Sequence, residues 1–80
     1  MKEYIATFHT HLAALMTCRN LNGRGAKAGM MPVPRKLSSS CGTCVRYQAD
    51  GPLLEAMDAD VEGVYGVIGK EQYIQLMNND

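Results

Sequence analysis

Two prolines, Pro32 and Pro34, constrain the fold of this chain more than any other residues. Proline has no N–H to donate to a sheet ladder, so a strand that reaches these positions must stop there. The stretch that follows, residues 35–43, contains three consecutive serines and a glycine and predicts a loop. Two cysteines, Cys41 and Cys44, stand at its end with the spacing C-x-x-C. The rest of the chain is therefore expected to be a scaffold that holds this loop.

The spacing of apolar residues changes between strand and helix periods along the chain. It predicts strands over residues 3–8, 26–33, 44–48 and 61–68, helices over residues 12–22 and 52–57, and a short terminal helix over residues 70–77. Right-handed crossovers turn a βαββαβ order into one antiparallel sheet. We therefore expect an α+β fold, a ferredoxin-like βαββαβ sandwich with two helices on one face of the sheet, formed by a single domain over residues 1–80.

The first predicted helix has one apolar stripe. It comprises Ala14, Leu15, Cys18 and Leu21, with Leu12 and Met16 beside it. Because Cys18 lies on this stripe, we expect it to be a buried structural thiol.

The composition limits the classes of function. The 80 residues carry no net charge and the pI is near 6.7, which argues against a general nucleic-acid-binding protein. No apolar run is long enough to span a membrane, and residues 1–4 lack the apolar core of a signal peptide, so a cytoplasmic location is expected. Three cysteines, an odd number, exclude a complete disulfide framework within one chain and direct attention to thiol reactivity. A chain of 80 residues can form only a thin hydrophobic core, which favours a homodimer or packing on a partner.

Topology brings several polar residues to one end of the predicted sheet. The first strand leaves the sheet where the second and third strands are joined, so His9, His11 and the loop around Cys41 should lie together. The partial positive charge of a helix N-terminus and the full charge of Arg35 both stabilise a thiolate over a thiol. A histidine can take or give a proton near neutral pH. Cys41 is therefore the expected reactive thiol.

Three segments carry a resemblance to a known family: Phe8–His11, Met31–Arg35 and Ser38–Gly42. They resemble the Putative Se/S carrier protein-like family of small bacterial proteins. The resemblance implies a protein that carries sulfur or selenium on Cys41, as a persulfide or selenopersulfide, and that needs no cofactor or metal. A cysteine desulfurase or another sulfur or selenium donor protein would load it, and an acceptor protein would unload it.

The resemblance also implies roles for neighbouring residues. Arg35 would stabilise negative charge on the sulfur, and His9 or His11 would move a proton. Gly42, next to the cysteine, would let the backbone of a partner approach closely. In the family pattern the position of Cys44 is often a small residue without a thiol, which implies that Cys41 acts without an obligate partner.

A second reading takes the two cysteines as a pair. Cys41, Cys44, His9 and His11 are ligand types suited to zinc, and C-x-x-C is also the spacing of thioredoxin-like redox sites. A second C-x-x-C is missing, however, and the pair here precedes a strand rather than a helix. The alternative function is thus a small metal-binding or redox-sensing interaction domain.

Overall fold

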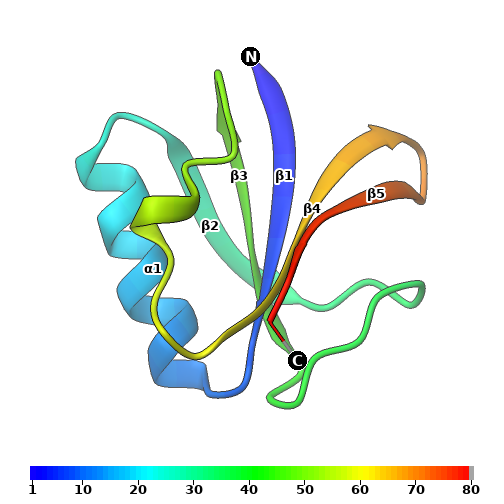
Figure 1. Ribbon diagram of the computed structural model, residues 1–80, viewed down its shortest axis with the longest axis horizontal. Helices are drawn as coiled ribbons and strands as arrows, with labels where there is room; N and C mark the ends of the chain where they lie inside the picture. The colour runs from blue at the N-terminus through cyan, green and yellow to red at the C-terminus, as the bar shows by residue number, and fades with distance from the viewer. Residues whose placement is uncertain (80) are drawn as a thin grey trace.

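An antiparallel sheet forms the frame of the molecule. The computed structural model describes residues 1–79. Within them the elements follow the order β1 (Lys2–Phe8), α1 (His11–Gly23), β2 (Lys27–Pro32), β3 (Thr43–Ala49), the 3₁₀ turn η1 (Leu54–Ala56), β4 (Val61–Gly69) and β5 (Gln72–Asn78). The five strands lie in the order β2-β3-β1-β4-β5, and each neighbouring pair is antiparallel (Figure 1). The sheet therefore has its first strand at the centre.

The predicted ferredoxin-like sandwich with two helices is wrong. Residues 1–79 contain one α-helix, and the short turn η1 stands where the second helix was expected. The reason is local: Leu53, directly before η1, has a left-handed backbone with φ of 52°, and Met57, directly after it, is extended. Only one turn fits between these two residues, so a packed helix cannot form.

The predicted terminal helix is also wrong, because residues 72–78 form β5. The chain reverses over Lys70 and Glu71, and Glu71 takes the left-handed φ of 56° that such a tight turn requires. Gly69 and Gln72 then pair directly, which returns the chain along β4.

Helix α1 starts at a conventional N-cap. The hydroxyl of Thr10 accepts a hydrogen bond from the amide of Ala13 at 3.1 Å, which satisfies one of the free donors of the first turn. The buried residues of the helix are Ala13, Ala14, Thr17 and Leu21, whereas Leu12 and Met16 are exposed. The helix thus packs on the sheet by a stripe rotated from the predicted one.

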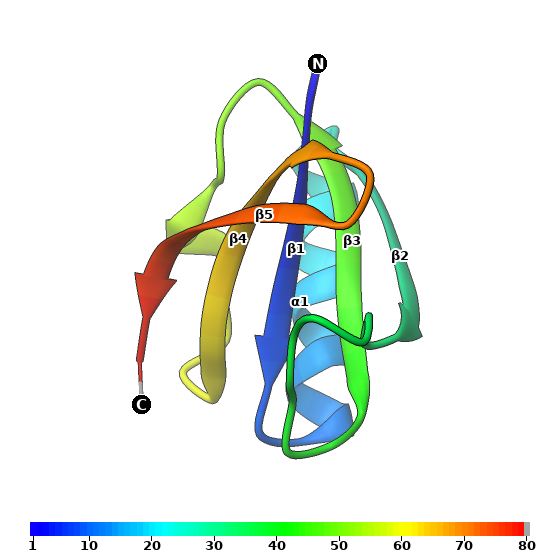
Figure 2. The ribbon, with the colours of Figure 1, turned by 90° about the vertical axis from the view of Figure 1, so that its right-hand side faces the viewer.

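The main core lies between α1 and the sheet. Strand alternation turns Tyr4, Ala6 and Phe8 of β1 towards the helix, where the rings of Tyr4 and Tyr47 stack with centroids 5.3 Å apart. Ile5 and Thr7 point to the other face, yet both are buried. Figures 1 and 2 show the β4–β5 hairpin and the connection between β2 and β3 on the side of the sheet opposite α1. These two segments cover the second face.

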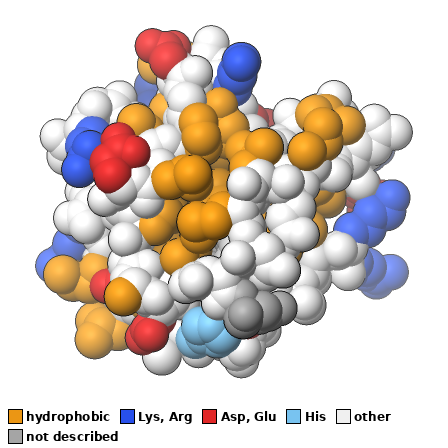
Figure 3. Space-filling view, in the orientation of Figure 1, with side chains coloured by type: hydrophobic (Ala, Val, Ile, Leu, Met, Phe, Trp, Pro, Cys, Tyr) orange, Lys and Arg blue, Asp and Glu red, His pale blue; other side chains and the backbone are white. Residues whose placement is uncertain are grey.

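Part of the helix-side face stays uncovered because η1 is so short. An apolar groove of about 680 Å³ lies over β1, β4 and β5. Tyr4, Pro52, Gly66, Ile74 and Leu76 are among the residues that line it. Figure 3, in the orientation of Figure 1, shows hydrophobic side chains gathered in the middle of the view, between α1 and the β4–β5 hairpin, and again over the tip of that hairpin.

Candidate functional site

The β2–β3 connection, residues 33–42, is called the cysteine loop below. It starts and ends with a hydrogen bond from the amide of Val33 to the carbonyl of Gly42, at 3.1 Å. Its last four residues, Ser39–Gly42, form a turn in which the amide of Gly42 donates to the carbonyl of Ser39 at 3.2 Å. Gly42 has a φ of +73°, a backbone conformation that glycine adopts without strain. We call residues 39–42 the cysteine turn.

Cys41 is partly buried in this turn and packs against the helix-side core. Its Sγ donates to the carbonyl of Thr43 at 3.4 Å and lies 3.6 Å from the hydroxyl oxygen of Ser39. The hydroxyl of Ser39 donates in turn to the carbonyl of Phe8 at 2.8 Å, which places the turn beside the end of β1, as expected from the topology. Carbonyl oxygens can only accept, so these contacts suit the neutral thiol.

Glu62, near the start of β4, holds the turn from a second side. Its Oε1 accepts from the amide of Ser40 at 2.8 Å, and its Oε2 accepts from the hydroxyl of Ser40 at 3.0 Å. Partial burial works to raise the pKa of Glu62, but the two bonds from Ser40, the charge of His9 and the hydroxyl of Ser39 outweigh it, and the pKa is lowered. The backbone amides of Ser40 and Gly42 are thus both engaged in hydrogen bonds within the protein.

No local signal in the sequence identifies Glu62 as part of the site. It lies 22 positions after Ser40 along the chain. The pairing of Phe8 with Val61, the residue before Glu62, brings the carboxylate to this end of the sheet. Only knowledge of the strand order could have revealed it.

The two histidines lie at the same end but differ in their contacts. His9 has its Nδ1 3.6 Å from Oε2 of Glu62, with 42% of its side chain exposed against 16% for Glu62. His11 is the first residue of α1 and is exposed, and its side chain makes no hydrogen bond to any of residues 1–79. The structure therefore joins His9 to the cysteine turn through Glu62 and leaves His11 at the surface.

Arg35 and Arg46, the two arginines nearest to Cys41 in the sequence, form no hydrogen bond with its sulfur. Arg35 lies in an exposed turn in which the amide of Leu37 donates to the carbonyl of Pro34, and it forms no ion pair with a described residue. Arg46 forms an ion pair with Glu3 instead, and its hydrogen bond lowers the pKa of that carboxyl. Neither guanidinium is thus held against the thiol.

Cys44 occupies a different environment from Cys41. It is fully buried in β3, on the face opposite α1, and its Sγ lies 3.8 Å from the carbonyl of Pro32, to which it donates. Burial raises the pKa of the thiol to about 11, with a smaller opposing effect from Arg46 and a smaller supporting one from Cys41. A thiol that is buried and weakly acidic is a poor nucleophile, which argues against an exchange mechanism through both cysteines.

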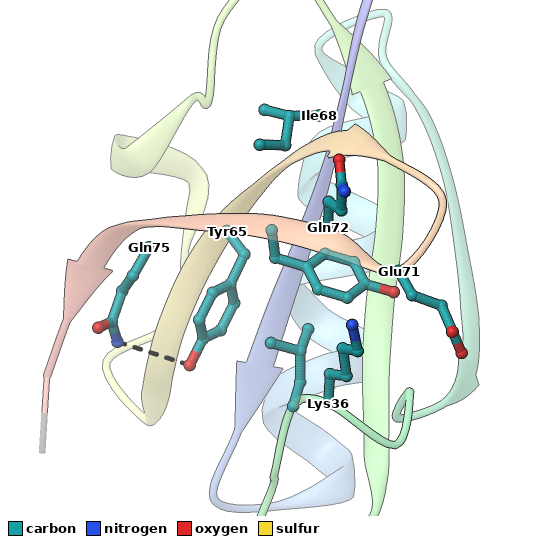
Figure 4. Close-up of a pocket in the computed structure, with 8 residues that line it drawn as sticks. Lys36, Tyr65, Ile68, Glu71, Gln72 and Gln75 are labelled. Carbon is teal, nitrogen blue, oxygen red and sulfur yellow. Dashed lines mark hydrogen bonds between the residues drawn. The ribbon is translucent and has the colours of Figure 1, made fainter.

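A second hollow, lined by both polar and apolar side chains, lies next to the cysteine loop. It has a volume of about 600 Å³ and is lined by Lys36 and Leu37 of the loop and by six residues of the β4–β5 hairpin: Tyr65, Ile68, Glu71, Gln72, Tyr73 and Gln75. Figure 4 shows Lys36 reaching from the loop below β5 and Gln75 pointing towards Tyr65, whose hydroxyl accepts from the Gln75 amide at 3.5 Å. The three cysteines, all within the described residues, lie outside its lining, so the hollow is separate from the sulfur chemistry.

Metal ligation finds no support in the arrangement of side chains. Residues 1–79 contain no group of three or more histidine, cysteine, aspartate or glutamate side chains placed to hold a metal ion. Cys18, the third cysteine, is half-buried on α1, and its sulfur accepts a hydrogen bond from the side-chain amide of Asn22 at 3.7 Å. Over the same part of the chain, no helix is long and apolar enough to cross a membrane.

The fold and the cysteine turn together define a class of protein: a small α+β domain that presents one partly exposed thiol at the end of its sheet. Residues 3–65 match the model of the family described as Putative Se/S carrier protein-like, and the chain belongs to this family. The match runs from β1 into β4 and leaves β5 outside. No curated protein and no solved structure matches the chain.

Proposed function

We propose that this protein carries sulfur or selenium on Cys41, as a persulfide or selenopersulfide, and passes it to an acceptor. The observation that carries the proposal is the placement of Cys41. In a chain of the Se/S carrier-like family, it is a partly exposed thiol on a turn held to both β1 and β4.

Loading is a thiol–persulfide exchange that needs no outside oxidant. The Cys41 thiolate attacks the outer sulfur of a donor persulfide; a new S–S bond forms on Cys41 and the S–S bond of the donor breaks. The proton that leaves the Cys41 thiol ends on the donor thiol. Unloading repeats the exchange in the other direction, because an acceptor thiolate attacks the outer sulfur and Cys41 is released as the leaving group.

The neighbouring residues support this exchange in the proposal. Gly42, exposed and without a side chain, lets the backbone of a partner approach the sulfur. Arg35 stands free at the surface of the cysteine loop, where it can meet an anionic group of the partner. His9 and His11 are exposed at the same end and can move the proton. Cys44 has no part in the exchange, because its thiol is buried.

The donor we propose is a cysteine desulfurase or another protein that holds sulfur or selenium as a persulfide, and the proposed location is the cytoplasm. A homodimer also stays a prediction. The apolar groove over β1, β4 and β5 is an uncovered apolar surface that such a dimer would bury. Sedimentation equilibrium at two protein concentrations measures whether two copies associate.

Intact mass spectrometry tests the carrier. After incubation with a cysteine desulfurase and cysteine, the protein should gain the mass of one sulfur atom, and Cys41→Ser should gain none. Cys18→Ser and Cys44→Ser are the matched controls, and both should load like the unsubstituted chain. Equal loading of Cys41→Ser would refute the proposal. Zinc that persists through gel filtration and is lost in Cys44→Ser would support the alternative metal-binding domain.

A further inference from the structure

Glu62, which was not among the predicted site residues, is hydrogen-bonded directly to the cysteine turn. Both of its carboxylate oxygens bind Ser40, at 2.8 Å to the amide and 3.0 Å to the hydroxyl. Ser40 is the residue directly before Cys41. A carboxylate that accepts two hydrogen bonds from one residue fixes both its backbone and its side chain.

The turn is held at two consecutive residues from two different strands. Ser39 is bound to the end of β1 through the carbonyl of Phe8, at 2.8 Å, and Ser40 is bound to the start of β4 through Glu62. Cys41, the next residue, packs against the helix-side core, and its sulfur makes two longer polar contacts, at 3.4 and 3.6 Å. The two strong anchors of the turn are therefore at the residues directly before it.

Glu62 also engages the donors of the residue next to the cysteine. The amide and hydroxyl of Ser40 point to its carboxylate, and the ring of His9 lies 3.6 Å from it. In this arrangement of the turn, the thiol of Cys41 donates to the carbonyl of Thr43. Among the described residues of β4, Glu62 is the one whose side chain is hydrogen-bonded to the turn.

We propose that Glu62 is a positioning residue for the sulfur chemistry of Cys41. Its carboxylate holds the cysteine turn against β4, and this fixes the direction in which the sulfur meets the persulfide of a donor protein. The inference rests on the proposed carrier function, because a fixed direction matters only for exchange with a partner. A small reagent in solution needs access to the sulfur and no particular direction.

The two kinds of reaction should therefore respond in opposite ways to Glu62→Ala. Loss of two hydrogen bonds to a charged acceptor should free the turn and raise the rate of Cys41 alkylation by iodoacetamide by about tenfold. Sulfur transfer from a cysteine desulfurase should slow by about tenfold or more, because the reacting atoms are no longer prealigned. Hydrogen exchange of the Ser40 amide should become faster in the same variant.

Two further variants separate positioning from stability. Glu62→Gln keeps an acceptor for the Ser40 amide, and both rates should stay within about threefold of the unsubstituted chain. Glu55→Ala removes a surface carboxylate that pairs with Arg24 at 3.3 Å, away from the turn, and should change neither rate. The alkylation of Cys44, which is buried in the intact fold, reports unfolding in every variant.

Unchanged alkylation and unchanged transfer in Glu62→Ala would overturn the proposal. A parallel rise in the alkylation of Cys41 and Cys44 would overturn it too, because Glu62 would then only stabilise the fold. If no variant, including the unsubstituted chain, accepts sulfur, the carrier function fails. The alkylation and hydrogen-exchange results still decide in that case whether Glu62 holds the turn.

Discussion

Replacement of Ser39 by alanine tests the link between the cysteine turn and the sheet. The Ser39 hydroxyl donates to the carbonyl of Phe8 at 2.8 Å and lies 3.3 Å from the carbonyl of Thr43. It is also 3.6 Å from the sulfur of Cys41. The substitution removes these contacts and leaves the backbone of the turn free to move away from β1.

The expected cost follows from the hydrogen bond that is lost. A hydrogen bond between neutral groups contributes about 0.5–1.5 kcal/mol net, and an acceptor left unpaired in a buried place adds to the loss. Phe8 is fully buried, whereas Ser39 is partly exposed. We therefore expect the free energy of unfolding to fall by about 1–2 kcal/mol. In a domain of this size, each 1 kcal/mol lowers the thermal midpoint by about 4–8 °C.

Ser38→Ala is the matched control, because Ser38 is exposed in the same loop and makes no hydrogen bond to a described residue. Urea unfolding of both variants measures the difference in free energy, and alkylation of Cys41 at fixed pH measures access to the sulfur. Ser39→Ala should lose stability and react faster than Ser38→Ala. Equal stability of the two variants would refute the role given to this hydroxyl.

Three further predictions concern pH and the helix cap. Burial raises the pKa of Cys44 from 9.0 to about 11. The stability that the neutral thiol of Cys44 contributes should be complete below pH 9 and should fall by up to about 3 kcal/mol as the pH rises to about 11. Urea titrations of the unsubstituted chain and of Cys44→Val measure this fall, and identical pH profiles of the two proteins would contradict the prediction. The pKa of Glu62 is lowered from 4.5, so its stabilising effect should be present above that pH and be lost as the pH falls below it; Glu62→Gln should show a shallower acid transition. Thr10→Ala removes the acceptor of the Ala13 amide and should cost about 1 kcal/mol in thermal unfolding, and an unchanged midpoint would contradict the cap.

The regular elements near the start of the chain could be read from local pattern. The predicted strand over residues 3–8 and helix over residues 12–22 correspond to β1 and α1, because β-branched and aromatic residues give way to helical spacing after a capping threonine. The buried face of α1 was harder to predict from the sequence. Alanines at 13 and 14 allow close approach to the sheet, and Leu12 and Met16 are left outside.

The end of the chain shows where local pattern fails. Tyr73, Ile74 and Met77 fit a helix by spacing, but β5 forms because the turn at Lys70 and Glu71 directs the segment back along β4. A short apolar run spans too few residues for its period to distinguish a strand from a helix. Here the pairing with β4 determines that the segment forms a strand. In the same way, Leu53 takes a left-handed conformation that no helix signal predicts.

In the candidate site, too, features that depend on neighbours in sequence were predictable and features that depend on long-range strand pairing were not. The Ser-Cys-Gly turn and its closeness to the end of β1 could be inferred, because they depend on neighbours in sequence and on simple strand order. The carboxylate of Glu62 could not, because only the pairing of β1 with β4 brings it to Ser40. The contrast between a partly exposed Cys41 and a buried Cys44 likewise required the register of β3.

The location of the added sulfur tests the central claim most directly. After loading by a cysteine desulfurase and capping of free thiols, trypsin cuts behind Lys36 and Arg46, so residues 37–46 give one peptide with both Cys41 and Cys44. Fragmentation of this peptide by tandem mass spectrometry separates the two positions. The carrier account predicts the extra sulfur on Cys41 alone; an extra sulfur on Cys44 or Cys18, with Cys41 unmodified, would contradict it.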